Sequence, residues 1–170
     1  ALAVSGLLVP RIGGPSVQPY QPPGLWKEVS HFGSTPATKQ VFVQDRGEKL
    51  YRRSLYTIVK RTSPHPSMAA FDAPNREMCI TRRGVTNTPL QALVTLNDPQ
   101  FAEAARVFAA RLLGESEGQN DAERIDLAFR KVTGRPPRQS ERSAIASFLS
   151  LERERFEGDR AGAERVIVQG

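Results

Sequence analysis

The side chains best suited to bind a ligand or take part in a reaction are concentrated between residues 71 and 83. This segment contains two carboxylates, three guanidiniums and the one cysteine of the chain, and Pro74 opposes a helix there. Guanidinium groups bind anions through paired hydrogen bonds, and carboxylates accept hydrogen bonds from the hydroxyl groups of a ligand. The segment therefore predicts either a binding site or a loop held in place by its own charges.

These two interpretations use the same residues differently. In a binding site for an anion or a sugar, Arg76, Arg82 and Arg83 line the site, and Asp72 or Glu77 orients the ligand. In a structural loop, Asp72, Arg76 and Glu77 hold the backbone against neighbouring helices, because a non-helical segment cannot satisfy its own polar groups. The sequence alone leaves both interpretations open.

An enzymatic alternative rests on the two carboxylates. Asp72 and Glu77 could act as the paired acid and base of glycoside hydrolysis, which requires a fixed separation between them. Carboxylates beside three arginines more often form an ion-pair network. A nucleophile pair of Cys79 and His65 has no further support, since Cys79 is predicted to be a buried apolar residue and His65 a surface residue. We therefore assign no catalytic residue and favour a non-enzymatic role.

Metal and cofactor sites are not predicted in this chain. A single cysteine excludes an internal disulfide and any metal or haem site that needs two cysteines. His31, His65 and Asp72 do not follow the ligand spacing of a known metal site. No apolar run is long enough to predict a membrane span.

The net charge of +6 favours anionic partners. Tyr56 is accompanied by four basic residues in a segment that could contact phosphates and stack bases, namely Arg52, Arg53, Lys60 and Arg61. Because the positive charge is spread along the whole chain, a solvated basic surface is the simpler interpretation, and nucleic acid is disfavoured as a partner. The candidate ligand-binding residues are Arg52, Arg53, Asp72, Arg76, Glu77, Arg82, Arg83 and Asn87.

The second half of the sequence contains the helices that would position these residues. A capping box with proline at the first helical position starts a helix at Thr88. A turn at residues 97–99 restarts the chain into a helix that ends at Gly114. Asn120 caps a third helix that stops at Gly134 and is predicted to bury Ile125, Ala128, Phe129 and Val132. A fourth helix over residues 138–157 is predicted to bury Ile145, Phe148, Leu149 and Phe156.

The first third of the sequence is predicted to be extended. Nine of the 13 prolines fall between Pro10 and Pro74, where helices and central strands tolerate them poorly. One helical turn is expected over residues 25–29 and one short strand over residues 40–44. A helix is expected over residues 48–61, with Tyr51, Leu55, Ile58 and Val59 on its apolar face. The predicted fold is all-α, a mainly helical bundle with a long extended Pro/Gly-rich arm (1–47) packed on a helical domain (48–170). The sequence at both ends predicts that the chain is a fragment of a larger protein.

Several runs of residues resemble a planctomycete-specific domain of unknown function. The most specific are residues 86–93 (TNTPLQAL) and the Asn-Asp-Pro run at 97–99, together with residues 12–26, 50–62 and 71–77. The resemblance implies the C-terminal end of an exported multidomain protein, in the periplasm or outside the cell. It also implies that a cytochrome c-like domain holds any haem, and that a lectin-like domain sometimes accompanies it.

The sequence therefore predicts a non-catalytic binding or docking module of a large exported protein. Its expected partners are other domains of the same polypeptide, and a polysaccharide is a further candidate. The alternatives that remain open are a glycan-active enzyme that uses Asp72 and Glu77, and a module that binds an anionic polymer through its basic segment.

Overall fold

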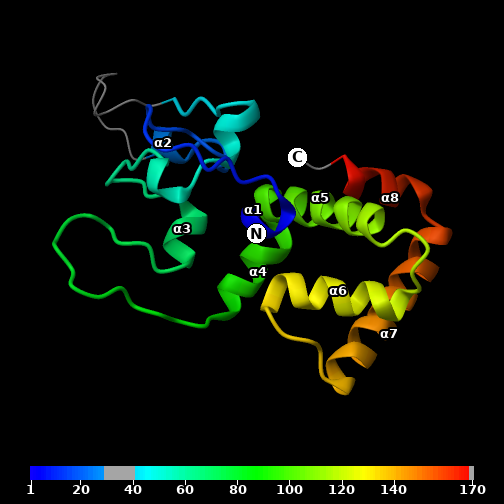
Figure 1. Ribbon diagram of the computed structural model, residues 1–170. Helices are drawn as coiled ribbons and strands as arrows, with labels where there is room; N and C mark the ends of the chain where they lie inside the picture. The colour runs from blue at the N-terminus through cyan, green and yellow to red at the C-terminus, as the bar shows by residue number, and fades with distance from the viewer. Residues whose placement is uncertain (29–40, 169–170) are drawn as a thin grey trace. The chain divides into compact units, whose positions relative to one another are not determined.

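The fold is mainly helical in the computed structural model, which describes residues 1–28 and 41–168 (Figure 1). Within these ranges there are eight α-helices and no β-strand, which confirms the predicted all-α class. The helices are α1 (Leu2–Ser5), α2 (Leu25–Glu28), α3 (Pro66–Ala70), α4 (Pro89–Asn97), α5 (Pro99–Glu115), α6 (Asp121–Thr133), α7 (Gln139–Glu157) and α8 (Arg160–Ile167).

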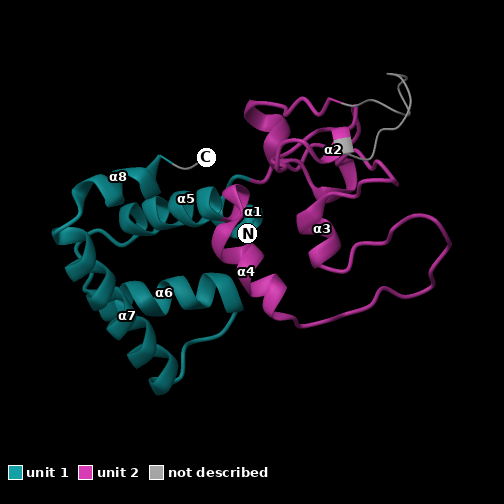
Figure 2. Ribbon diagram, turned by 180° about the vertical axis from the view of Figure 1, so that it is seen from behind, with its two compact units in different colours: residues 1–7, 102–170 teal, residues 8–101 magenta. Residues whose placement is uncertain are grey.

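The chain divides into two compact units, which Figure 2 shows in different colours. The first unit comprises residues 1–7 and 102–170, and the second comprises residues 8–101. The predicted boundary between an arm and a helical domain after residue 47 stays a prediction, because compactness alone does not define an independently folding domain.

Helix α6 in the first unit begins and ends at its predicted caps. The Asn120 side chain accepts a hydrogen bond from the backbone N–H of Glu123 at 3.0 Å, and the Glu123 carboxylate accepts one from the N–H of Asn120 at 3.1 Å. This reciprocal pair satisfies two N–H groups that have no partner within the helix. At the other end, Gly134 takes a left-handed φ of 75°, which glycine adopts without steric cost.

Bidentate ion pairs tie α6 to α7. Asp126 accepts from Arg142 Nε at 2.8 Å and from Nη2 at 2.7 Å, and Asp121 accepts from both terminal nitrogens of Arg153. Hydrogen bonds from these guanidiniums lower the pKa of both carboxyl groups below the usual aspartate value. The planar geometry of such pairs fixes the register of the two helices as well as adding attraction.

The core of the first unit is smaller than the sequence predicts. Ile125 is buried, with 6% of its surface exposed, and Leu149 and Phe156 are half-buried. Ile145 and Phe148 were predicted to be buried, and this was wrong, because they are 38% and 63% exposed. Helical periodicity shows that an apolar stripe exists, but it does not show how much of that stripe the neighbouring helices cover.

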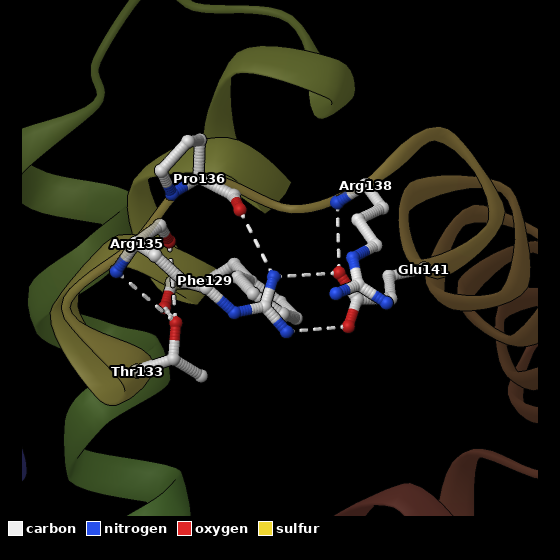
Figure 3. Close-up of polar contacts among 6 residues, drawn as sticks. All are labelled: Phe129, Thr133, Arg135, Pro136, Arg138 and Glu141. Carbon is white, nitrogen blue, oxygen red and sulfur yellow. Dashed lines mark hydrogen bonds and ion pairs between the residues drawn. The ribbon is translucent and has the colours of Figure 1, made fainter.

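The turn between α6 and α7 is fixed by Glu141, as Figure 3 shows. Its carboxylate accepts from Arg135 Nη1 at 2.8 Å and Nη2 at 2.6 Å, and from the Arg138 backbone N–H at 2.7 Å. The Arg135 guanidinium also lies over the Phe129 ring, 4.9 Å from its centre. The hydrogen bonds from Arg135, followed by that from Arg138, lower the pKa of Glu141 from 4.5 to about 2.

This lowered pKa predicts that acid weakens the turn. A carboxyl whose pKa is lower in the folded state stabilises the fold fully above its unfolded value of 4.5, and this contribution is lost as the pH falls towards 2. We expect the Glu141 carboxyl carbon to titrate with a midpoint of about 2 in an NMR experiment. Stability of the Glu141→Gln variant should also fall less between these two pH values. A midpoint of 4.5 would contradict the prediction.

The extended arm in the second unit pairs with the segment before α3. Val9 N–H donates to the Tyr51 carbonyl at 3.0 Å, and Val17 N–H donates to the Tyr56 carbonyl at 2.8 Å. The Ile58 N–H returns a hydrogen bond to the Val17 carbonyl at 2.9 Å. These contacts form two isolated parallel bridges, so Val9 and Val17 pair their backbone groups without belonging to a strand.

The helix predicted over residues 48–61 was wrong. The structure has two short 3₁₀ turns there, η1 (Gly47–Tyr51) and η2 (Ser54–Tyr56), with extended backbone at Arg52. The cause is tertiary, since the backbone groups that a helix would use are paired with the arm. Leu55 was placed on the apolar face of that helix, but it is 67% exposed.

Two further predictions concern the segments beside the undescribed residues. The predicted turn at residues 25–29 is α2, and residue 29 lies outside the described part of the chain. The strand predicted over residues 40–44 was wrong for residues 41–44, which form no strand. Residue 40 lies outside the described part of the chain. Instead, Phe42 packs edge-on against the buried Trp26, with ring centres 5.2 Å apart.

Helices α4 and α5 confirm the predicted turn at residues 97–99. Thr88 and Gln91 form the expected capping box, and Pro89 is the first residue of α4. The chain restarts at Pro99, and the Asp98 carboxylate accepts from the Gln100 N–H at 2.9 Å. Helix α5 continues one residue past the predicted end at Gly114.

Candidate functional site

The loop between α3 and α4 is closed at its base by Asp72. This residue takes a left-handed φ of 57°, a conformation that aspartate tolerates better than most residues do. Its carboxylate accepts from the Thr86 N–H at 2.8 Å and from the Thr86 hydroxyl. Gln91 on α4 donates to the Thr86 hydroxyl oxygen and to the Ala70 carbonyl, both at 3.0 Å. Asp72 therefore has the loop-holding role that the structural interpretation gave it.

Arg83 adds a second connection across the base of the loop. Its guanidinium donates to the carbonyls of Phe71 at 3.1 Å and Asp72 at 3.3 Å. Beyond this base the loop runs out from α3 and α4 (Figure 1), and all residues from 74 to 87 are exposed. The segment is thus fixed at its two ends and open in the middle.

A pocket of about 380 Å³ lies where the base of this loop meets α3 and η2. Most of its wall is apolar. Its polar side chains are those of Ser54, His65, Arg76 and Arg83. The apolar part of the lining consists of Leu55, Ile58, Val59, Pro64, Met68, Ala69, Phe71, Ala73 and Pro74.

The charge of this pocket is positive. Arg76 and Arg83 both line it, although they lie at different points along the loop. Among the described residues of the lining there is no carboxylate to neutralise them. Arg76 has a left-handed φ of 62°, which is uncommon for a residue with a long side chain.

His65 is the remaining titratable group of the pocket. Its Nε2 lies 2.6 Å from the Tyr20 carbonyl, so Nε2 carries the hydrogen and Nδ1 is the acceptor in the neutral ring. Burial lowers the pKa of His65, while the Tyr20 carbonyl and the Asp98 charge oppose this shift. Nδ1 is buried and has no hydrogen-bond partner in the described structure. His65 was predicted to be a surface residue, and this was wrong.

Comparison with known protein families places the chain in one of them. The model of the PSD1 family, described as a protein of unknown function (DUF1553), matches residues 1–149. The chain belongs to this family. No curated protein and no solved structure shows significant similarity to the chain.

Two further arginines among the predicted ligand-binding residues lie beside Tyr56 in the second unit. Arg52 is only 4% exposed and donates to the Arg11 and Gly13 carbonyls at 3.0 and 2.6 Å. Its guanidinium also lies 4.1 Å from the centre of the Tyr56 ring. Arg53 is exposed and lies 5.8 Å from the same ring centre. Arg52 thus binds the backbone of the arm, whereas the Arg53 side chain faces solvent.

The open part of the loop carries the other predicted residues. Glu77, Arg82 and Asn87 are exposed, and none of them belongs to the described lining of the pocket. Cys79 was predicted to be buried, and this was wrong, because it is exposed. The structure therefore brings Arg76 and Arg83 together at one pocket and leaves Glu77, Arg82 and Asn87 outside it.

Sequence reasoning missed most of the apolar wall of the pocket. Met68 lies on α3, and no helix was predicted at these residues. The available signal was Pro66, since proline is common at the first position of a helix. Leu55 and Ile58 were recognised as apolar but were assigned to a helix that does not form.

Other kinds of site find less support in the described residues. A second pocket of about 530 Å³ lies between α3 and α4, beside Gln21, whose buried side-chain nitrogen has no hydrogen-bond partner there. No group of three or more His, Cys, Asp or Glu side chains in these residues is arranged to hold a metal ion. Every helix in the described ranges is too short or too polar to cross a membrane.

Proposed function

We propose that this PSD1 domain is a non-catalytic binding module whose pocket at the base of the loop takes an acidic sugar of a polysaccharide. The observation that supports the proposal most directly is that Arg76 and Arg83 meet at one apolar pocket without a carboxylate in its described lining. A guanidinium beside an apolar wall favours a ligand that carries a carboxylate on a partly apolar body. The carbon-bound hydrogens of a sugar ring can lie on such a wall.

Three of the four polar side chains of the pocket have separate roles in this proposal. Arg83 is held by two backbone carbonyls, so its position is set before the ligand arrives. Arg76 supplies the second positive charge from the open side of the loop. His65 stays neutral at pH 7, because burial lowers its pKa, so it adds no further charge to the pocket.

The arrangement favours binding over hydrolysis. Glycoside hydrolysis needs one carboxylic acid and one carboxylate on either side of the bond that breaks. The Asp72 carboxylate is occupied by Thr86 at the base of the loop, and Glu77 lies outside the described lining of the pocket. We therefore give neither residue a catalytic role in the proposal.

The proposal also concerns the larger protein in which this domain occurs. We infer a module of an exported multidomain protein, located in the periplasm or outside the cell, in which other domains of the polypeptide carry out any chemistry. Haem and electron transfer would belong to such a partner domain. The motivation is the motif resemblance.

Isothermal titration with trigalacturonate and with maltotriose, a neutral trisaccharide, tests the proposal. We expect the acidic sugar to bind and the neutral one to bind at least about tenfold more weakly, which is the effect of losing one charge-assisted hydrogen bond. The Arg76→Ala variant should weaken the binding of trigalacturonate by a similar factor.

The Arg82→Ala variant is the matched control, because it removes the same charge from the same loop but from a residue outside the pocket. It should change the affinity for trigalacturonate by less than about twofold. Equal weakening by both substitutions would indicate attraction by the net charge alone. That result, or failure of the wild-type chain to bind trigalacturonate, would overturn the proposal.

A further inference from the structure

Helix α7 presents an apolar stripe that no described part of the chain covers. Ile145, Phe148 and Leu151 are 38%, 63% and 60% exposed. They recur one helical turn apart, so their side chains lie close together on one side of the helix. The chain carries no charge from residue 143 to residue 151. Single exposed apolar residues are common on protein surfaces, but three in register on an uncharged stretch are typical of a contact surface.

The stripe has the same pattern when it is read in either direction. Ile145 and Leu151 lie one turn before and one turn after Phe148. Glu141 and Arg155 lie one heptad before and after it, on the same side of the helix. Two copies of α7 packed antiparallel about a two-fold axis at Phe148 would therefore place Ile145 against Leu151 of the second copy, and Glu141 against Arg155 of the second copy.

The charges at the two ends of the stripe fit this pairing. Within one chain, Arg135 binds Glu141 at 2.6 Å, and Arg155 lies 3.4 Å from Glu152. Bringing Glu141 beside Arg155 of a second copy would place the two pairs next to each other with alternating charge. The order would be Arg135 and Glu141 of one copy, then Arg155 and Glu152 of the other. The Arg155 side chain is 68% exposed, so it can reach a second molecule.

We propose that this chain forms a symmetric dimer through antiparallel packing of α7, with Phe148 at the two-fold axis and a second copy of the chain as the partner. The apolar residues exclude water at the centre of the interface, and the ion pairs at its two ends select the antiparallel register. The proposal does not depend on the sugar site, which lies in the other compact unit.

Sedimentation equilibrium of the 170-residue chain tests this proposal over a range of concentrations. We expect a monomer–dimer equilibrium, and we expect Phe148→Ser to raise its dissociation constant at least about tenfold, as the loss of a central aromatic contact does. The matched control is Val132→Ser, since Val132 is also exposed, at 61%, but lies on α6. This control should leave the dissociation constant within about twofold of the wild-type value.

A charge exchange tests the register. Glu141→Arg and Arg155→Glu should each weaken self-association, because like charges then meet at both ends of the dimer. An equimolar mixture of these two variants should dimerise again, since both ion pairs are restored between unlike chains. Circular dichroism of each variant checks that α7 still forms. A wild-type chain that stays monomeric, or equal effects of Phe148→Ser and Val132→Ser, would overturn the proposal.

Discussion

Replacing Arg52 with alanine should lower the free energy of unfolding by about 3 kcal/mol, the combined effect of two lost charge-assisted hydrogen bonds and a lost contact with an aromatic ring. The Arg52 guanidinium is buried, donates to the carbonyls of Arg11 and Gly13, and lies over the Tyr56 ring. Its removal leaves two carbonyls of the arm without a donor. The arm should then separate from the segment that contains η1 and η2.

The fluorescence of Trp26 during urea unfolding provides the measurement. Trp26 is the single tryptophan of the chain, is buried, and lies in the same compact unit as Arg52. We expect a lower urea midpoint for Arg52→Ala, and an intermediate midpoint for Arg52→Lys, which keeps the charge but not the planar group with its several donors.

Arg53→Ala is the matched control for this prediction. Arg53 is the next residue, carries the same charge and is exposed, and its guanidinium lies farther from the Tyr56 ring. The substitution should change the free energy of unfolding by less than about 0.5 kcal/mol. Similar midpoints for the Arg52 and Arg53 variants would show that burial of Arg52 does not stabilise the arm.

In the first unit, the largest expected effect belongs to Ile125. Replacing this residue with alanine should cost about 3 kcal/mol, because the substitution removes buried methyl and methylene groups and leaves a cavity. Ile125 lies in the middle of α6 and is 6% exposed. The apolar core of this unit is small, so the surrounding helices have few other apolar contacts to compensate.

Circular dichroism at the helical band, followed during chemical unfolding, measures this effect, since the long helices α5, α6 and α7 provide most of the helical signal. Val132→Ala is the control, because Val132 belongs to the same helix but is 61% exposed. Its effect should stay below about 0.5 kcal/mol. An equally small loss in Ile125→Ala would mean that α6 is not held by its buried face.

These two positions illustrate different degrees of predictability. Ile125 was correctly assigned to the inner face of α6, because both caps of that helix and its apolar spacing are local features. Val132 was assigned to the same face, and this was wrong, because it is 61% exposed. Arg52 was assigned to a helix and to a ligand site. Its burial depends on the arm, which reaches it from far away in the sequence, and no local pattern contains that information.

The candidate site likewise has features that the sequence predicted and features that it did not. The sequence singled out Asp72, Arg76 and Arg83 by their concentration in a non-helical segment. It did not show that Asp72 closes the loop onto Thr86, or that Arg76 and Arg83 share a pocket while Arg82 does not. These distinctions depend on the path of the loop, which includes two residues with left-handed backbone, Asp72 and Arg76.

The sequence by itself determined where most of the long helices begin and end, because caps, prolines and glycines act within a few residues of their own position. Only the tertiary structure decided that residues 48–61 are not a helix, that part of the α7 stripe stays exposed, and that two arginines meet at one pocket. The physical reason is that backbone pairing and burial depend on segments distant in the chain, and their free energies exceed local helix preferences.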